Sequence, residues 1–201
     1  MVKHDRYDAF IHGEDFNRAV FADDDLTAVL RAHVHFEHHI ESLLLAAIPN
    51  SEPLLNELMF LRKLNIAKKL GVIDGPFFKA VNKFNEIRNQ FAHGFERRTL
   101  TAQDDGNLSR TLSAELIVDG DISGQELFAH LESQWMQQQK SKRTPPAGVR
   151  SRLFMMALQT LLLALVVEVQ QGRRAPTPPR GTARVSHTDA HSALGPTSPD
   201  R

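Results

Sequence analysis

The sequence predicts an all-α fold, an up-and-down helical bundle of four to five helices. Apolar residues recur at three- and four-residue steps along several segments between residues 25 and 167, which is the period of one helix face. Acidic, Ser, Pro and Gly residues bound these segments in the order that starts and ends helices. The chain has 201 residues and no cysteine, so one buried core, without disulfides or thiolate metal sites, is expected.

The first helix is predicted over residues 25–48. Asp23, Asp24 and Asp25 form its start signal, because acidic side chains favour the positive end of the helix dipole. Pro49 and Asn50 end it. Its apolar stripe contains Leu26, Val29, Leu30, His33, Phe36, Ile40, Leu43, Leu44 and Ala47. His33 falls on this stripe, so we expect it to be a buried core histidine.

Two further helices follow after short turns. The second is predicted to begin near Pro53, with Asn50 or Ser51 as its cap, and to end at Gly71. The third begins at the cap Asp74 and ends at Gly94. The second helix has the inner stripe Leu54, Leu58, Leu61 and Leu64, and the third has Pro76 in its first turn and the stripe Phe77, Val81, Phe84, Ile87 and Phe91.

Residues 99–120 interrupt the helical pattern. Residues 104–107 have the composition of a turn and residues 114–118 fit a strand, so a loop or small β-hairpin insertion is predicted. Ser123 and Glu126 then form a capping box for a fourth helix carrying Leu127, Leu131 and Trp135. Residues 143–148 are a linker.

The segment Leu153–Val167 is almost wholly apolar. A membrane span needs about twenty such residues, and this segment is shorter and contains Gln159. It therefore predicts a buried bundle helix or an oligomer seam. The chain divides into an N-terminal acidic segment (1–22), a helical domain (23–171) and a tail (172–201) rich in Pro, Arg, Ser and Thr, which is predicted to be disordered because it lacks large apolar residues.

The formal net charge is +0, but the charge is unevenly distributed. Residues 60–98 carry nine bases and three acids, which favours either attraction of phosphates or a solvated helix face. Residues 1–25 carry no apolar stretch after their first basic residues, so no signal peptide is predicted. Together with the lack of cysteine, this favours the cytoplasm.

The end of the third helix carries the motif Arg88-Asn89-Gln90-Phe91-Ala92-His93, preceded by the turn Leu70-Gly71-Val72-Ile73. These residues, with Arg31-Ala32-His33 and Glu37 of the first helix, resemble the HEPN superfamily, and within it the mannitol-operon-repressor-like group. The resemblance covers about residues 25–95. It implies a HEPN-like helical bundle and an isologous homodimer.

The resemblance also implies a metal-independent endoribonuclease with a toxin, defence or RNA-processing role. Histidine suits proton transfer near neutral pH, and arginine suits phosphate oxygens. Arg88 would then stabilise the phosphate, His93 would transfer protons, Asn89 would orient the helix end or the scissile group, and Glu37 would contact Arg88 or line the cleft. Lys79, Lys83, Arg97 and Arg98 are the expected RNA-binding or cleft-lining residues. No metal and no cofactor are expected. Several HEPN toxins carry a tyrosine where this chain has Phe95, so the hydroxyl that those toxins offer for modification is missing.

The spacing of the motif leaves alternatives open. Arg88 and His93 are about 140° apart on a regular helix, so they share a site only if the helix ends at His93 or if a second copy completes the site. The same residues could instead hold the first helix against the third. The alternative function is a non-enzymatic regulator, similar to the mannitol operon repressor, that contacts proteins along Leu153–Val167. Expected partners are a second copy, RNA and a protein such as an antitoxin or regulator, without a membrane.

Overall fold

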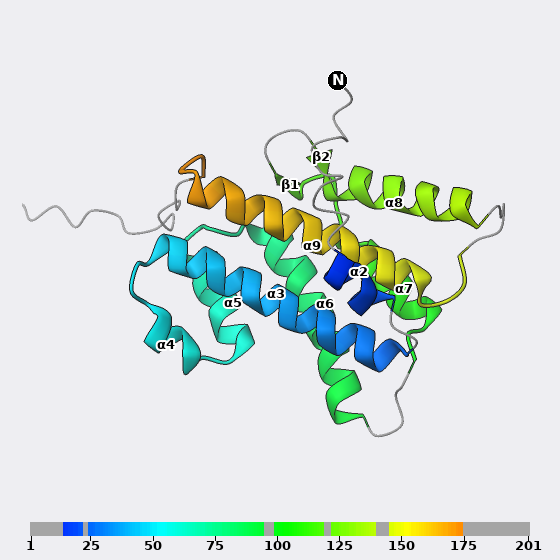
Figure 1. Cartoon of the computed structure of the whole chain (residues 1–201), viewed down its shortest axis with the longest axis horizontal. Coiled ribbons are helices and arrows are strands. Elements are labelled where there is room, and N and C mark those ends of the chain that lie inside the picture. Colours follow the sequence, from blue (N-terminus) through cyan, green and yellow to red (C-terminus); the bar gives the residue numbers. More distant parts are fainter. Residues whose placement is uncertain (1–13, 22–23, 95–98, 119–121, 140–144, 175–201) are drawn as a thin grey trace, which may run out of the picture.

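The computed structural model describes residues 14–21, 24–94, 99–118, 122–139 and 145–174. Within these residues the chain forms eight helices and two very short strands (Figure 1). The helices are α2 (Glu14–Val20), α3 (Asp25–Ala47), α4 (Glu52–Asn56), α5 (Phe60–Lys69), α6 (Gly75–His93), α7 (Ala102–Ser109), α8 (Gly124–Gln138) and α9 (Val149–Gln170). The all-α prediction is therefore confirmed, with more helices than the four to five expected.

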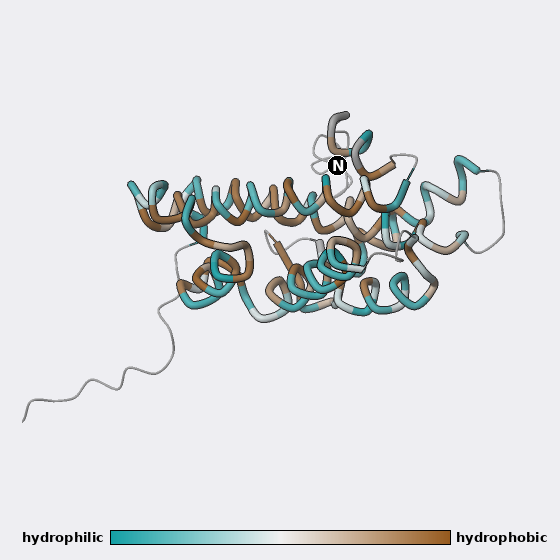
Figure 2. Tube along the Cα trace, turned by 90° about the horizontal axis from the view of Figure 1, so that it is seen from below, coloured by the Kyte–Doolittle hydropathy of each residue, from teal (hydrophilic) through white to brown (hydrophobic). Residues whose placement is uncertain are grey.

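The two longest helices, α3 and α9, lie side by side and run parallel (Figure 1). Asp25 at the start of α3 pairs with Arg152 at the start of α9, and His39 contacts Gln159 further along both helices. Figure 2 shows the helices at right angles to the first view, with many of their hydrophobic residues turned inward. Because α3 also packs against α2, α5 and α6, it is the central helix that these three helices share with α9.

The start of α9 is held by a cluster of buried and partly buried residues, here called the N-terminal clasp: Asp25, Asp105, Gly148, Ser151 and Arg152. The Asp105 carboxylate accepts hydrogen bonds from the backbone N–H of Gly148 (3.0 Å) and Ser151 (2.7 Å) and from the Ser151 hydroxyl (2.5 Å). Asp25 accepts from Arg152 at 2.8 Å and from the backbone N–H of Leu100 at 2.8 Å. Gly148 has a positive φ of 86°, which only glycine adopts without strain.

Three of the predicted helices begin where their cap signals place them. Asp24, Asp74 and Ser123 each accept a hydrogen bond from the backbone N–H three residues later. The apolar stripe of α6 is buried as predicted, and His33 is a buried histidine on α3. The segment Leu153–Val167 lies inside α9, and most of it is buried within the subunit.

The second predicted helix is in fact two helices, α4 and α5, separated at residues 57–59. Two residues of its expected inner stripe, Leu54 (56%) and Leu61 (43%), are exposed. The break turns Phe60 and Lys63 toward α3, where the Phe60 ring lies 4.4 Å from the His33 ring. Tertiary contacts with α3, rather than local helix propensity, therefore set this break.

The turn predicted at residues 104–107 is wrong, because these residues form the interior of α7. Thr101 and Asp104 make a capping box in which each side chain accepts from the other residue's backbone N–H. This cap, with the buried bonds of Asp105, offsets the cost of about 1 kcal/mol of a helical glycine at Gly106. The predicted hairpin is reduced to an antiparallel pair of two-residue strands, β1 (Ile117–Val118) and β2 (Ile122–Ser123).

The two ends of the chain are described only in part. Helix α2 lies within the predicted N-terminal acidic segment, and its Phe16 and Val20 are buried in the core. At the other end, Arg174 pairs with Asp74 at 3.2 Å. The predicted disorder of the tail falls almost wholly on residues 175–201, which lie outside the described residues. By length and composition alone, α9 could cross a membrane, but most of its apolar stretch is buried in the fold.

Candidate functional site

The motif helix α6 contributes three side chains to a pocket between α3, α5 and α6. Asn85, Arg88 and Asn89 line it from α6, since positions i, i+3 and i+4 share a helix face. His33 and Glu37, four residues apart on α3, line the opposite wall. The α5 side completes the pocket, which has a volume of about 460 Å³, with Met59, Phe60, Leu61, Arg62 and Asn65. This volume is within the usual range of small-molecule sites.

Arg88 lies half-buried in this pocket with part of its guanidinium unpaired. One Nη donates to Asn89 Oδ1 at 3.1 Å. The Nε–H is fully buried and has no hydrogen-bond partner in the described part of the chain. A buried donor without a partner costs about 1–3 kcal/mol, so hydrogen bonds to the surrounding helices do not hold this guanidinium in place.

His33 and Asn85 form the floor of the pocket. Both are buried, and His33 Nε2 lies 3.3 Å from Asn85 Oδ1. Burial lowers the pKa of His33, and the nearby Arg88 cation lowers it further. The imidazole is therefore neutral at pH 7, so one ring nitrogen donates and the other accepts.

Glu37 lines the pocket but pairs with Lys63 rather than with Arg88. The buried Lys63 ammonium donates to Glu37 at 2.7 Å and to Glu41 at 2.5 Å. Burial opposes the charge on Lys63, but the hydrogen bonds and charges of the two carboxylates outweigh it and raise the pKa of this lysine. With Arg62 and Arg88, three cationic groups stand beside two carboxylates, which leaves one positive charge in excess.

His93 does not line this pocket. It is exposed at the end of α6, about 140° around the helix from Arg88 and about 40° from Lys79. Lys79 is exposed as well, and Lys83 forms an ion pair with Glu86 at 2.7 Å. The structure thus brings Arg88, Asn89 and Glu37 together and separates them from His93 and the two lysines. Arg97 and Arg98 lie outside the described residues.

Sequence reasoning missed several residues of the pocket. Phe60, Arg62 and Asn65 carry no motif, and their approach to α3 depends on the break between α4 and α5. Asn85, by contrast, could have been found from its spacing, because it lies one turn before Arg88 and Asn89. His33 could have been found in the same way from Glu37.

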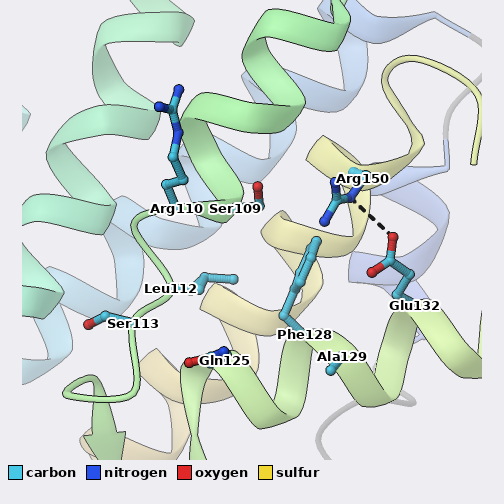
Figure 3. Close-up of a pocket in the computed structure, with 9 residues that line it drawn as sticks. All are labelled: Ser109, Arg110, Leu112, Ser113, Gln125, Phe128, Ala129, Glu132 and Arg150. Carbon is cyan, nitrogen blue, oxygen red and sulfur yellow. Dashed lines mark ion pairs between the residues drawn. The ribbon is translucent and has the colours of Figure 1, made fainter.

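A second pocket, of about 420 Å³, lies between α7, α8 and α9 (Figure 3). Its Arg150 lies over the Phe128 ring, 5.5 Å from the ring centre, and Arg150 Nε is 3.1 Å from Glu132 Oε1 in a close ion pair without hydrogen-bond geometry. Arg110 points away from Arg150 in Figure 3, and it donates to Gly106 and Asn107. Because the charge of Arg150 is paired with the Glu132 carboxylate and Arg110 is bonded to its own helix end, this pocket is the weaker candidate.

Among the described residues, no group of three or more His, Asp or Glu side chains could hold a metal ion. Comparison with models of protein families found no matching family, and comparisons with curated proteins and with solved structures found no match either.

Proposed function

We propose that the protein is a HEPN-type endoribonuclease that cleaves RNA without a metal ion. The observation that carries this proposal is the Arg88 guanidinium, held in a pocket with a buried donor that has no partner among the described residues. An arginine that only held two helices together would be bonded to backbone carbonyls. The one hydrogen bond of Arg88 in the described structure is to the neighbouring Asn89 side chain.

The reaction needs three contributions. A base takes the proton of the ribose 2′-OH, the 2′-oxygen attacks the adjacent phosphorus, and an acid protonates the 5′-oxygen as the P–O5′ bond breaks. The products are a 2′,3′-cyclic phosphate and a 5′-hydroxyl. Arg88 stabilises the extra negative charge on the non-bridging oxygens. His93, exposed and near the end of α6, transfers the protons.

Arg88 and His93 face different sides of α6, so one subunit does not bring them together. In an isologous dimer, the outer face of α6 from one copy can cover the pocket of the other. Each site then takes Arg88 from one copy and His93 from the second. Lys79 and Lys83 lie on the same side of α6 as His93, about 21 Å and about 15 Å before it along the helix, and attract the RNA backbone on either side of the cleaved bond.

The test is RNA cleavage by the full chain in excess EDTA, with Arg88→Ala and His93→Ala beside it. Arg31→Ala and His38→Ala are the matched controls, because both side chains are exposed on α3 and do not line the pocket. We expect cleavage to fall about 100-fold or more in the two motif variants and to stay unchanged in the controls.

Mixing the two inactive variants tests the shared site. A heterodimer of Arg88→Ala and His93→Ala subunits keeps one intact site, so a random mixture should regain roughly a quarter of the wild-type activity. No recovery in a mixture shown to exchange subunits contradicts the shared site. An inactive wild type, tested as a confirmed dimer on several RNAs, contradicts the nuclease itself.

The second candidate is a non-enzymatic regulator that binds a protein. The contact surface that the sequence predicts for it, Leu153–Val167, is mostly buried in the core, so the partner must bind to another surface. Leu45, Ile48 and Leu54 are exposed around the turn between α3 and α4, and apolar side chains of this kind favour protein contacts. Loss of partner binding in Leu54→Asp, with RNA left intact by the wild type, would support this candidate.

A further inference from the structure

The α6 side of the pocket offers mainly hydrogen-bond donors. Asn85 is only 7% exposed, and its Oδ1 faces His33. Its Nδ2 amino group has no partner in the described part of the chain, and Asn85 lines the pocket. Asn89 uses its Oδ1 for Arg88, which leaves its amino group as a donor too. With the remaining Nη–H groups of the half-buried Arg88 guanidinium, these amino groups favour a ligand rich in acceptors.

An apolar wall faces these donors from α5. Met59 is 79% exposed and Leu61 is 43% exposed at the rim, and Phe60 packs against His33 deeper in the pocket. A phosphate group alone makes no favourable contact with such an apolar wall. A nucleobase has both apolar faces and acceptor atoms on its edge, and unpaired bases are recognised by this combination of contacts.

We propose that this pocket binds one unpaired nucleotide of the RNA, with its phosphate on Arg88 and its base between the Asn85 amide and the Met59 side. This inference rests on the proposed nuclease function and names its substrate as single-stranded RNA. A base within a duplex cannot enter, because its edge is paired and its faces are stacked.

The test compares ligands that differ only in the base. The four nucleoside 5′-monophosphates, ribose 5-phosphate and inorganic phosphate are titrated into the full chain by calorimetry. We expect at least one nucleotide to bind tenfold or more tightly than ribose 5-phosphate. Arg88→Ala should weaken all of the phosphate-bearing ligands.

The contribution of the base is measured as a ratio, the dissociation constant of ribose 5-phosphate divided by that of the tightest-binding nucleotide. Asn85→Asp keeps the oxygen that faces His33 and replaces the free amino group by a second oxygen. The new negative charge weakens the binding of both phosphate-bearing ligands, so the ratio of their dissociation constants reports the base contact alone. We expect this ratio to fall from tenfold or more to below threefold. Asn82→Asp is the matched control, because Asn82 lies on the same helix, outside the pocket, with its amide bonded to Glu86; its ratio should stay unchanged.

Met59→Ala is a second variant that does not depend on the buried floor, since Met59 is largely exposed. We expect its ratio to fall about threefold. The inference is overturned if ribose 5-phosphate binds the wild type as tightly as every nucleotide, if no ligand binds, or if neither Asn85→Asp nor Met59→Ala lowers the ratio.

The failure of this inference is distinct from the failure of the nuclease. RNA cleavage that depends on Arg88 and His93, without any preference for nucleotides over ribose 5-phosphate, leaves the nuclease and removes the nucleotide pocket. Nucleotide binding without cleavage of any RNA leaves the pocket and removes the nuclease.

Discussion

The N-terminal clasp and the Arg88 pocket both bury polar groups, but they treat them differently. In the clasp, both oxygens of Asp105 and both oxygens of Asp25 accept hydrogen bonds. In the pocket, Arg88 Nε and the Asn85 amino group have no partner among the described residues. The two regions share α3, so the difference arises from which neighbours α3 meets.

Polar groups of the clasp hold the fold, whereas those of the pocket keep donors without partners at the site where the proposed ligand would bind. A saturated buried network stabilises one arrangement of helices, because breaking any bond strands a donor or an acceptor. A donor that stays unpaired inside the protein destabilises it until something binds. Variants in the clasp should therefore change stability, and variants in the pocket should change binding or activity.

The largest expected effect on stability is in the clasp. Asp105→Ala strands two backbone N–H groups and the Ser151 hydroxyl, and it should lower the free energy of unfolding by about 4 kcal/mol. Urea denaturation measures this. Glu115→Ala removes an exposed acid and should change the same quantity by less than about 0.5 kcal/mol. A small effect of Asp105→Ala would contradict the structural role of the clasp.

A second effect on stability comes from His39, further along the contact between α3 and α9. Burial, then the neighbouring His38 and His35, lower its pKa from 6.5 to about 4. Between these two pKa values the unfolded chain binds more protons than the folded protein. The contribution of His39 to the free energy of unfolding is therefore fully present above pH 6.5 and is lost as the pH falls toward 4. We expect a loss of about 2 kcal/mol between pH 7 and pH 5.

Denaturation at both pH values, compared with His39→Gln, isolates this contribution. The variant should lose this part of the pH dependence, and His38→Gln, at an exposed position, should keep most of it, because burial is the larger cause of the lowered His39 pKa. His33, whose pKa is also lowered, leaves a residual slope in both variants. An equal slope in His39→Gln and the wild type would show that the α3–α9 contact does not depend on a neutral His39.

A smaller effect is expected where the pocket meets the core. Lys63→Met leaves Glu37 and Glu41 without their shared cation and should lower the free energy of unfolding by about 1.5 kcal/mol. Lys83→Met removes the exposed pair with Glu86 and should change it by less than about 0.5 kcal/mol. Equal losses in the free energy of unfolding for the two variants would show that Lys63 contributes no more to stability than an exposed lysine.

The smallest expected change in stability is that of Arg88→Ala, under about 1 kcal/mol. The substitution removes a buried donor that has no partner in the described structure and strands only the half-buried Asn89 oxygen. Denaturation of this variant beside Arg31→Ala measures it. A loss as large as that of Asp105→Ala would make Arg88 a structural clamp and would remove the difference between the two regions.

The sequence by itself determined the helices whose signals are local. Asp24, Asp74 and Ser123 start their helices because a cap needs only a backbone N–H three residues away. The stripe of α6 and the burial of α9 follow from periodicity and apolar content, because burying an apolar helix face is favourable whichever helices cover it. The placement of Asn85, Arg88 and Asn89 on one face of α6 follows from spacing alone.

Only the tertiary structure decided the features that depend on distant partners. The break before Phe60 forms because α3 offers His33 and Glu37 to the start of α5, and residues 104–107 stay helical because Asp105 reaches the start of α9, more than forty residues later. The same packing turns Arg88 inward and leaves His93 outside. No local sequence pattern predicts the break before α5, the helical state of residues 104–107 or the orientation of Arg88. The free energy that stabilises them comes from contacts between segments far apart in the chain.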